Sequence, residues 1–191
     1  IEEGPAAQFY NSLFVVADGE IEFIHRKINL ATYGRLEDGK HFAAGRYVET
    51  FELPGPEAPS PWRASSLICA DVWNPALVHL AALHGCTALF GPISSAVEAV
   101  GVEFDNPNGW DTNLRFYAMT YGGSRILDPF GRVVAQAGRE EALIAGELDY
   151  EAVRKARYLL PTVRDSNLAL LQREVDRLVG IIGVPEAVRK L

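Results

Sequence analysis

The 191-residue chain is predicted to adopt an α/β fold in which helices cover short buried strands. Three observations support this expectation. Short apolar runs at 65–68 and 87–90 have the length and composition of buried strands. Between them, Asn74 followed by Pro75 is typical of a helix N-cap and first helical residue. The hydrophobic content of 48% is enough for one sizeable core.

Turn and cap signals predict the remaining elements in chain order. Asp18-Gly19 predicts the turn of a hairpin, and four prolines within 54–61 predict an exposed connection. Asp128 to Gly131 predict a second hairpin turn, and Ser166 is the expected cap of the last helix. Helices are expected at 75–84, 111–121, 151–159 and 166–181, and a last strand at 143–148. We expect one domain over residues 1–165 and a helical tail over 166–191.

Cys69 lies where the strand predicted at 65–68 gives way to a helix. Such a bend lifts a side chain off the end of a sheet and directs nearby backbone N–H groups towards whatever the sulfur attacks. A free cysteine is more often a small buried core residue, and Cys86, at the start of the next strand, is expected to be one. The placement of Cys69 fits a nucleophile as well as a core residue, and the surrounding motifs decide between the two roles.

Short motifs spread over most of the chain follow one another in a specific order. They are Tyr10-Asn11-Ser12, residues 25–30, residues 33–42 closed by Gly45, the cysteine bend, residues 90–96, residues 123–131 and residues 159–165. Their order and spacing resemble the nitrilase superfamily of carbon–nitrogen hydrolases. The resemblance implies a four-layer α-β-β-α sandwich, incomplete in this chain, and hydrolysis of amide, carbamoyl or nitrile groups through a cysteine thioester without a cofactor.

The resemblance also implies roles for individual residues. Cys69 would be the nucleophile, which needs a neighbouring base or cation because an ordinary thiol is mostly protonated at neutral pH. Lys27 would supply that cation and, with the N–H of Ala70, donate to the oxyanion of the tetrahedral intermediate. Asp38 takes the place of a family glutamate that acts as an acid/base or positioning group, and Trp73 would contact the substrate.

The chain departs from the family pattern at three places. The general-base glutamate of the family precedes the lysine, but Glu2 and Glu3 do not match its motif, so we expect the base to lie outside this sequence. At 121–123 the glycine-serine hairpin follows a helix at once, where the family has a further strand and loop. We therefore expect residues to be missing there and before Ile1. Asn29 stands where the family usually has a histidine.

Composition and charge limit the classes of molecule that the protein is expected to bind. A net charge of −7 argues against nucleic acid and anionic membranes, and no apolar run approaches the length of a membrane span. Two cysteines fit a reducing compartment, so a cytoplasmic location is expected. No metal site is expected, because the four histidines lack zinc-like spacing (His25, His41, His79 and His84). The expected partners are a small amide or nitrile and further copies of the chain, as a homodimer or higher homo-oligomer.

Two alternatives to an enzyme of this kind stay open. A non-catalytic nitrilase-fold protein for binding or assembly would explain the missing base and the presence of Asp38. A cysteine–histidine protease is the weaker alternative, because no histidine has a supporting family signature. Alkylation separates the first two classes, since an activated Cys69 must react faster than Cys86.

Overall fold

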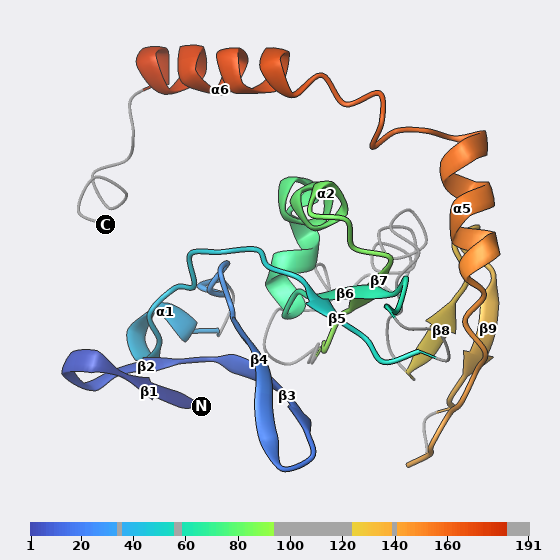
Figure 1. The fold of residues 1–191 in the computed structure, drawn as a ribbon. Helices are drawn as coiled ribbons and strands as arrows, with labels where there is room; N and C mark the ends of the chain where they lie inside the picture. The colour runs from blue at the N-terminus through green and yellow to red at the C-terminus, as the bar shows by residue number, and fades with distance from the viewer. Residues whose placement is uncertain (34–35, 56–58, 94–123, 139–140, 183–191) are drawn as a thin grey trace.

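The computed structural model describes residues 1–33, 36–55, 59–93, 124–138 and 141–182 (Figure 1). The helix expected at 111–121, the junction at 121–123 and the end of the motif at 90–96 lie outside these residues. Within the described ranges, helices are interspersed among groups of strands, and the strands form four small sheets. The expected α/β class is confirmed.

Two antiparallel hairpins form the N-terminal part. β1 (Glu2–Gly4) pairs with β2 (Gln8–Tyr10) across the 3-10 turn η1 (Pro5–Ala7), and β3 (Ser12–Ala17) pairs with β4 (Glu20–Arg26). Asp18 and Gly19 have φ of 51° and 83°, so both lie in the left-handed region that a tight two-residue turn requires. The hairpin predicted at Asp18-Gly19 is confirmed.

A three-stranded sheet lies next to these hairpins. β5 (Phe51–Glu52) runs antiparallel to β6 (Arg63–Ser66), and β6 runs parallel to β7 (Ala88–Phe90). The crossover between β6 and β7 passes through η2 (Cys69–Trp73) and α2 (Pro75–Leu83), which covers the sheet (Figure 1). Asn74 caps α2 by accepting a hydrogen bond from the N–H of Ala76 at 3.0 Å, as predicted. A core cluster fills the space between helix and sheet: Val48, Leu67, Val72, Leu77, Ala81 and Cys86.

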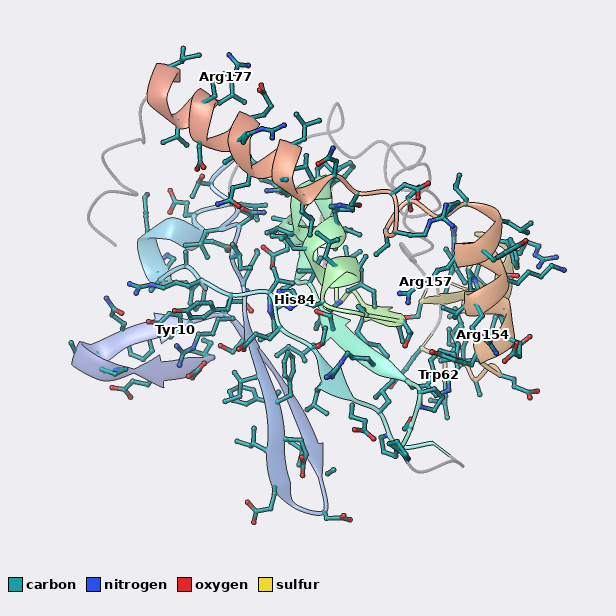
Figure 2. All side chains as sticks on the ribbon, turned by 45° about the horizontal axis from the view of Figure 1, so that its top comes forward. Tyr10, Trp62, His84, Arg154, Arg157 and Arg177 are labelled. Atoms are coloured by element: carbon teal, nitrogen blue, oxygen red, sulfur yellow. The ribbon has the colours of Figure 1, made fainter. Side chains whose placement is uncertain are left out.

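The C-terminal part holds the last hairpin and two helices. β8 (Arg125–Leu127) and β9 (Val133–Gln136) flank the predicted turn, where the Asp128 carboxylate accepts hydrogen bonds from the N–H groups of Phe130 and Arg132. α5 (Tyr150–Leu159) packs beside β8 and β9, and Arg157 reaches from it to the carbonyl of Cys86 at 2.5 Å (Figures 1 and 2).

The strand expected at 143–148 is wrong. Among the residues that the structure describes, the segment has no ladder partner, and Leu143 is 98% exposed. A Cβ built at Gly146 would lie 3.0 Å from the Val134 side chain and 3.2 Å from that of Ile126. The segment thus passes over the side chains of β8 and β9 and does not extend their ladder.

The cap predicted for the last helix is also wrong by one residue. α6 (Leu168–Ile182) is capped by Asn167, whose side-chain oxygen accepts from the N–H of Leu170 at 3.0 Å. The Ser166 hydroxyl donates to the carbonyl of Thr162 and lies 3.1 Å from Nε2 of His79. α6 stands away from the rest of the chain (Figure 1), and no helix among the described residues combines the length and the apolarity of a membrane span.

Candidate active site

Cys69 occupies the bend between β6 and η2 in an unusual backbone conformation. Its φ of 48° lies in the left-handed region that favours glycine, and the residue is partly exposed. The N–H of Cys69 donates to the carbonyl of Pro92 at 3.0 Å, and the N–H of Leu67 donates to that of Phe90 at the same distance. These bonds fix the bend against the end of β7. Strained residues of this kind cluster at active sites.

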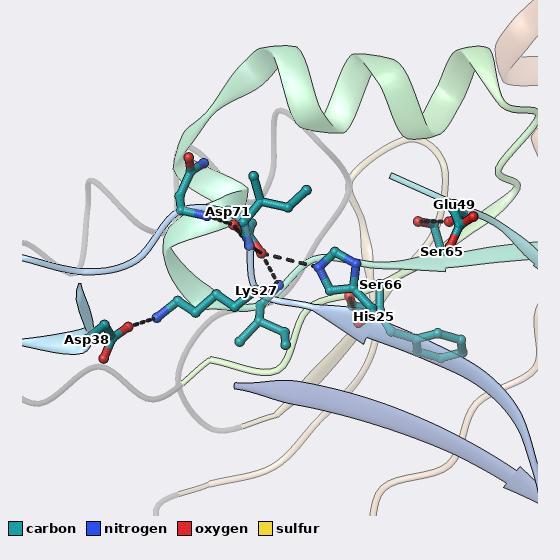
Figure 3. Close-up of polar contacts among 11 residues, drawn as sticks. His25, Lys27, Asp38, Glu49, Ser65, Ser66 and Asp71 are labelled. Atoms are coloured by element: carbon teal, nitrogen blue, oxygen red, sulfur yellow. Dashed lines mark hydrogen bonds and ion pairs between the residues drawn. The ribbon is translucent and has the colours of Figure 1, made fainter. Parts of the chain in front are cut away.

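Lys27 follows β4 and is buried, with only 5% of its side chain exposed. Its Nζ lies 2.5 Å from Oδ2 of Asp38 (Figure 3). The same oxygen also accepts a hydrogen bond from the N–H of Ala31 at 3.1 Å. Asp38 begins the short helix α1 (Asp38–His41). The resemblance implied a role for both residues, and the structure brings them together as an ion pair in which the lysine is buried and Asp38 is partly exposed.

A second polar cluster lies beneath the bend, and the sequence analysis did not assign it a role. Asp71 of η2 is fully buried, and its Oδ2 lies 3.3 Å from Nε2 of the equally buried His25 (Figure 3). The Asp71 carboxylate also accepts backbone N–H groups from Ile28, Asn29 and Ile68. The signal for it in the sequence was a carboxylate inside the apolar run 67–72, because a buried charge needs partners.

Tyr33 is a further residue of the site that the sequence analysis left without a role. Partial burial raises the pKa of its phenol, and the negative charges of Cys69 and Asp38 raise it further. The phenol therefore lies within electrostatic reach of both residues. Tyr33 is thus linked electrostatically to Cys69 and to Asp38, the partner of Lys27.

The remaining candidates take positions around the bend. Ala70 follows Cys69 in η2 and is buried, whereas Trp73 ends η2 and is 39% exposed. Glu2 is unsuited to act as a base, because its hydrogen bonds to Arg26 lower the pKa of its carboxyl group, and Ser12 also donates to it. Among the residues that the structure describes, no group of three or more His, Cys, Asp or Glu side chains is arranged to hold a metal ion.

Cys86 is a core residue, as predicted, and its burial is expected to make the folded protein less stable at alkaline pH. Burial raises the pKa of its thiol to about 11, against an ordinary value of about 8.5. Between these pH values the unfolded chain loses the thiol proton while the folded chain keeps it. The contribution of this thiol to the free energy of unfolding is therefore complete below about pH 8.5. It falls by about 3 kcal/mol as the pH rises to 11.

Urea unfolding of the wild type and Cys86→Ala at pH 8 and pH 10.5 measures this dependence. We expect the wild type to lose more stability over this range than the variant. Equal losses in the two proteins would contradict the assignment.

Comparison with known proteins gives a consistent set of relatives. Residues 1–158 match the family model described as carbon–nitrogen hydrolase. The chain is 27% identical to the 2-oxoglutaramate amidase of Bacillus subtilis, covering 82% of this chain and 62% of that protein. It is 24% identical to human omega-amidase NIT2, covering 93% and 69% respectively. It is 29% identical to an (R)-stereoselective amidase of Pseudomonas, covering 91% and 64%. The chain thus spans 62% to 69% of the length of these relatives.

Solved structures show the same fold. A carbon–nitrogen hydrolase from Helicobacter pylori superimposes with a TM-score of 0.71 at 20% identity, over 88% of this chain and 66% of that chain. Nit3 of Saccharomyces cerevisiae, a member of the nitrilase superfamily, gives a TM-score of 0.65 at 24% identity, over 81% and 59%. The described elements therefore form a nitrilase-type α/β fold.

Proposed function

The chain belongs to the carbon–nitrogen hydrolase family, and on this basis we propose that it hydrolyses the carbon–nitrogen bond of a small amide with Cys69 as the nucleophile. The observation that carries the proposal is the Lys27–Asp38 pair, whose buried lysine lies in the segment that the Asp71 carboxylate bonds to the cysteine bend. A fixed cation beside a thiol favours the thiolate and stabilises the oxyanion that forms on attack. Several relatives are amidases by name, which supports an amide as the substrate.

The proposed reaction has two stages. The Cys69 sulfur bonds to the carbonyl carbon, and Lys27 with the N–H of Ala70 holds the negative charge that develops on the oxygen. Collapse of this intermediate breaks the carbon–nitrogen bond, and the nitrogen leaves as ammonia after taking up the thiol proton. Water then adds to the thioester, which releases the acid and returns the proton to the sulfur. Trp73, at the open end of η2, is proposed to contact the substrate.

Three carboxylates that could be considered as the base already have hydrogen-bond or ion-pair partners. Asp38 holds Lys27, Asp71 accepts backbone N–H groups, and Glu2 pairs with Arg26. We therefore assign the base that carries the thiol proton to none of these three. The same observation favours the second candidate function, a non-catalytic member of the family that binds an amide without cleaving it.

Trapping the thioester separates the two functions. The protein is incubated with 2-oxoglutaramate, simple aliphatic amides, a carbamoyl compound and a nitrile, and released ammonia is measured with and without hydroxylamine. We expect ammonia from at least one amide, a hydroxamate when hydroxylamine competes with water, and an acyl mass on the Cys69 peptide. Amide binding by calorimetry with no ammonia and no adduct would favour the non-catalytic protein.

We also propose that the protein is a homodimer or higher homo-oligomer in the cytoplasm. α6 carries exposed apolar side chains at helical spacing along one face, including Leu168, Leu171, Val175 and Leu178, and such a face is typical of an interface between chains. Neither cysteine forms a disulfide, which fits a reducing compartment. Size-exclusion chromatography coupled to light scattering tests the assembly, and a monomer would contradict it.

A further inference from the structure

One buried carboxylate links the segment that carries Lys27 to the segment that carries Cys69. Oδ1 of Asp71 accepts the N–H of Asn29 at 2.6 Å and that of Ile28 at 3.1 Å. Oδ2 accepts the N–H of Ile68 at 3.1 Å. Ile28 directly follows Lys27, and Ile68 directly precedes Cys69. Asp71 is therefore bonded to the backbone one residue away from each of the two.

The fold makes this link necessary. Lys27 follows β4 and Cys69 follows β6. In the part of the chain that the structure describes, these strands belong to different sheets, and no backbone ladder joins them directly. Asp71 spans the gap because it is the third residue of η2 and its side chain reaches back to the N–H of Ile68. Hydrogen bonds to an ionised carboxylate are about twice as strong as those between neutral groups.

We propose that Asp71 is a positioning residue that sets the distance between Lys27 and the Cys69 sulfur, an inference that rests on the proposed function. A carboxylate with no exposed surface costs free energy unless its oxygens are fully bonded, and here three backbone donors satisfy both oxygens. His25 adds a fourth, longer contact on the Oδ2 side. An apolar residue would fill the same space but could not hold the two segments together.

Asp71→Asn tests the role with little change in volume. Its amide oxygen can keep the bonds to Ile28 and Asn29, but its NH2 group then faces the N–H of Ile68, so the cysteine bend is released from the lysine segment. We measure the rate of Cys69 alkylation by iodoacetamide at pH 7 with peptide mapping, which requires no substrate. The rate is expected to fall by about tenfold in Asp71→Asn.

Asp128→Asn is the matched control. Asp128 also accepts two backbone N–H groups, from Phe130 and Arg132, but in the turn between β8 and β9. It is expected to change the alkylation rate of Cys69 by less than about twofold.

The same substitution in a Lys27→Met background shows whether Asp71 acts through Lys27. Lys27→Met alone is expected to slow alkylation, and Asp71→Asn is expected to add less than about a further twofold, because its target is gone. A general loss of structure would slow or speed alkylation equally in both backgrounds. Independent, multiplying effects would therefore overturn the proposal, as would an unchanged rate in folded Asp71→Asn.

The proposed function fails in a different way. If wild-type Cys69 reacts no faster than Cys86, the thiol is not activated, and both the function and this inference are overturned. If Asp71→Asn does not fold, hydrogen exchange of the wild type decides the matter. The amides of residues 28, 29 and 68 are then expected to share one opening free energy, since one carboxylate holds all three. Amides at 28 and 29 that exchange far faster than that at 68 would overturn the link.

Discussion

Cys69→Ala is expected to lose all measurable ammonia release and all acyl labelling, a fall of at least about 10⁴-fold in turnover. The substitution removes the only atom of the site that is proposed to form a bond to substrate. Cys86→Ala is the matched control, because it removes the other thiol from the core cluster beneath α2. It is expected to keep turnover within about twofold while costing about 1 kcal/mol of stability through a small cavity. Steady-state ammonia assays and peptide mapping measure both variants, and equal losses of turnover would rule out Cys69 as the nucleophile.

Gly45→Ala is expected to give the largest loss of stability, about 3 kcal/mol. A Cβ at this position would lie 2.1 Å from the carbonyl oxygen of Arg26 and 2.8 Å from its carbonyl carbon. Both are backbone atoms, so no side-chain rotation relieves the clash. The N–H of Gly45 also donates to the carbonyl of Lys27 at 2.8 Å, and the displaced backbone is the one that positions the lysine. Turnover is therefore expected to fall together with stability.

Gly138→Ala provides the comparison for this clash. A Cβ there would meet no atom of the described residues within 4 Å. Its free energy of unfolding is expected to change by less than about 0.5 kcal/mol. Urea denaturation of the three proteins at pH 7 supplies the values, and a Gly45→Ala midpoint equal to that of the wild type would show that the backbone accommodates the methyl group.

The elements predicted correctly from the sequence are those that are determined by residues adjacent in the chain. Asp18-Gly19 and Asn74-Pro75 each specify a turn or a helix start through the conformation and hydrogen bonding of two adjacent residues. The strand predicted at 143–148 is wrong because a strand depends on a hydrogen-bonding partner elsewhere in the chain, and the local sequence does not reveal whether the segment finds one.

In the candidate site, too, local features could be predicted from the sequence and long-range contacts could not. The position of Cys69 at a bend follows from its immediate neighbours, and the pairing of Lys27 with Asp38 joins residues only 11 positions apart. The bonds that Asp71 makes to Ile28 and Asn29 span 43 and 42 positions. An isolated carboxylate in an apolar run indicates that such partners exist but cannot name them. Long-range hydrogen bonds of this kind need the folded chain.

The left-handed backbone conformation of Cys69 brings the stability of the fold into conflict with the proposed catalytic role of the residue. Any side chain with a Cβ costs about 1 kcal/mol or more in this conformation, and only glycine adopts it freely. Selection for thermal stability alone would therefore favour glycine at this position. That substitution would stabilise the fold but remove the proposed nucleophile. A cysteine at this position thus lowers the thermodynamic stability of the fold and supplies a reactive thiol. A relative with glycine at this bend is expected to be more stable at this position and catalytically inactive.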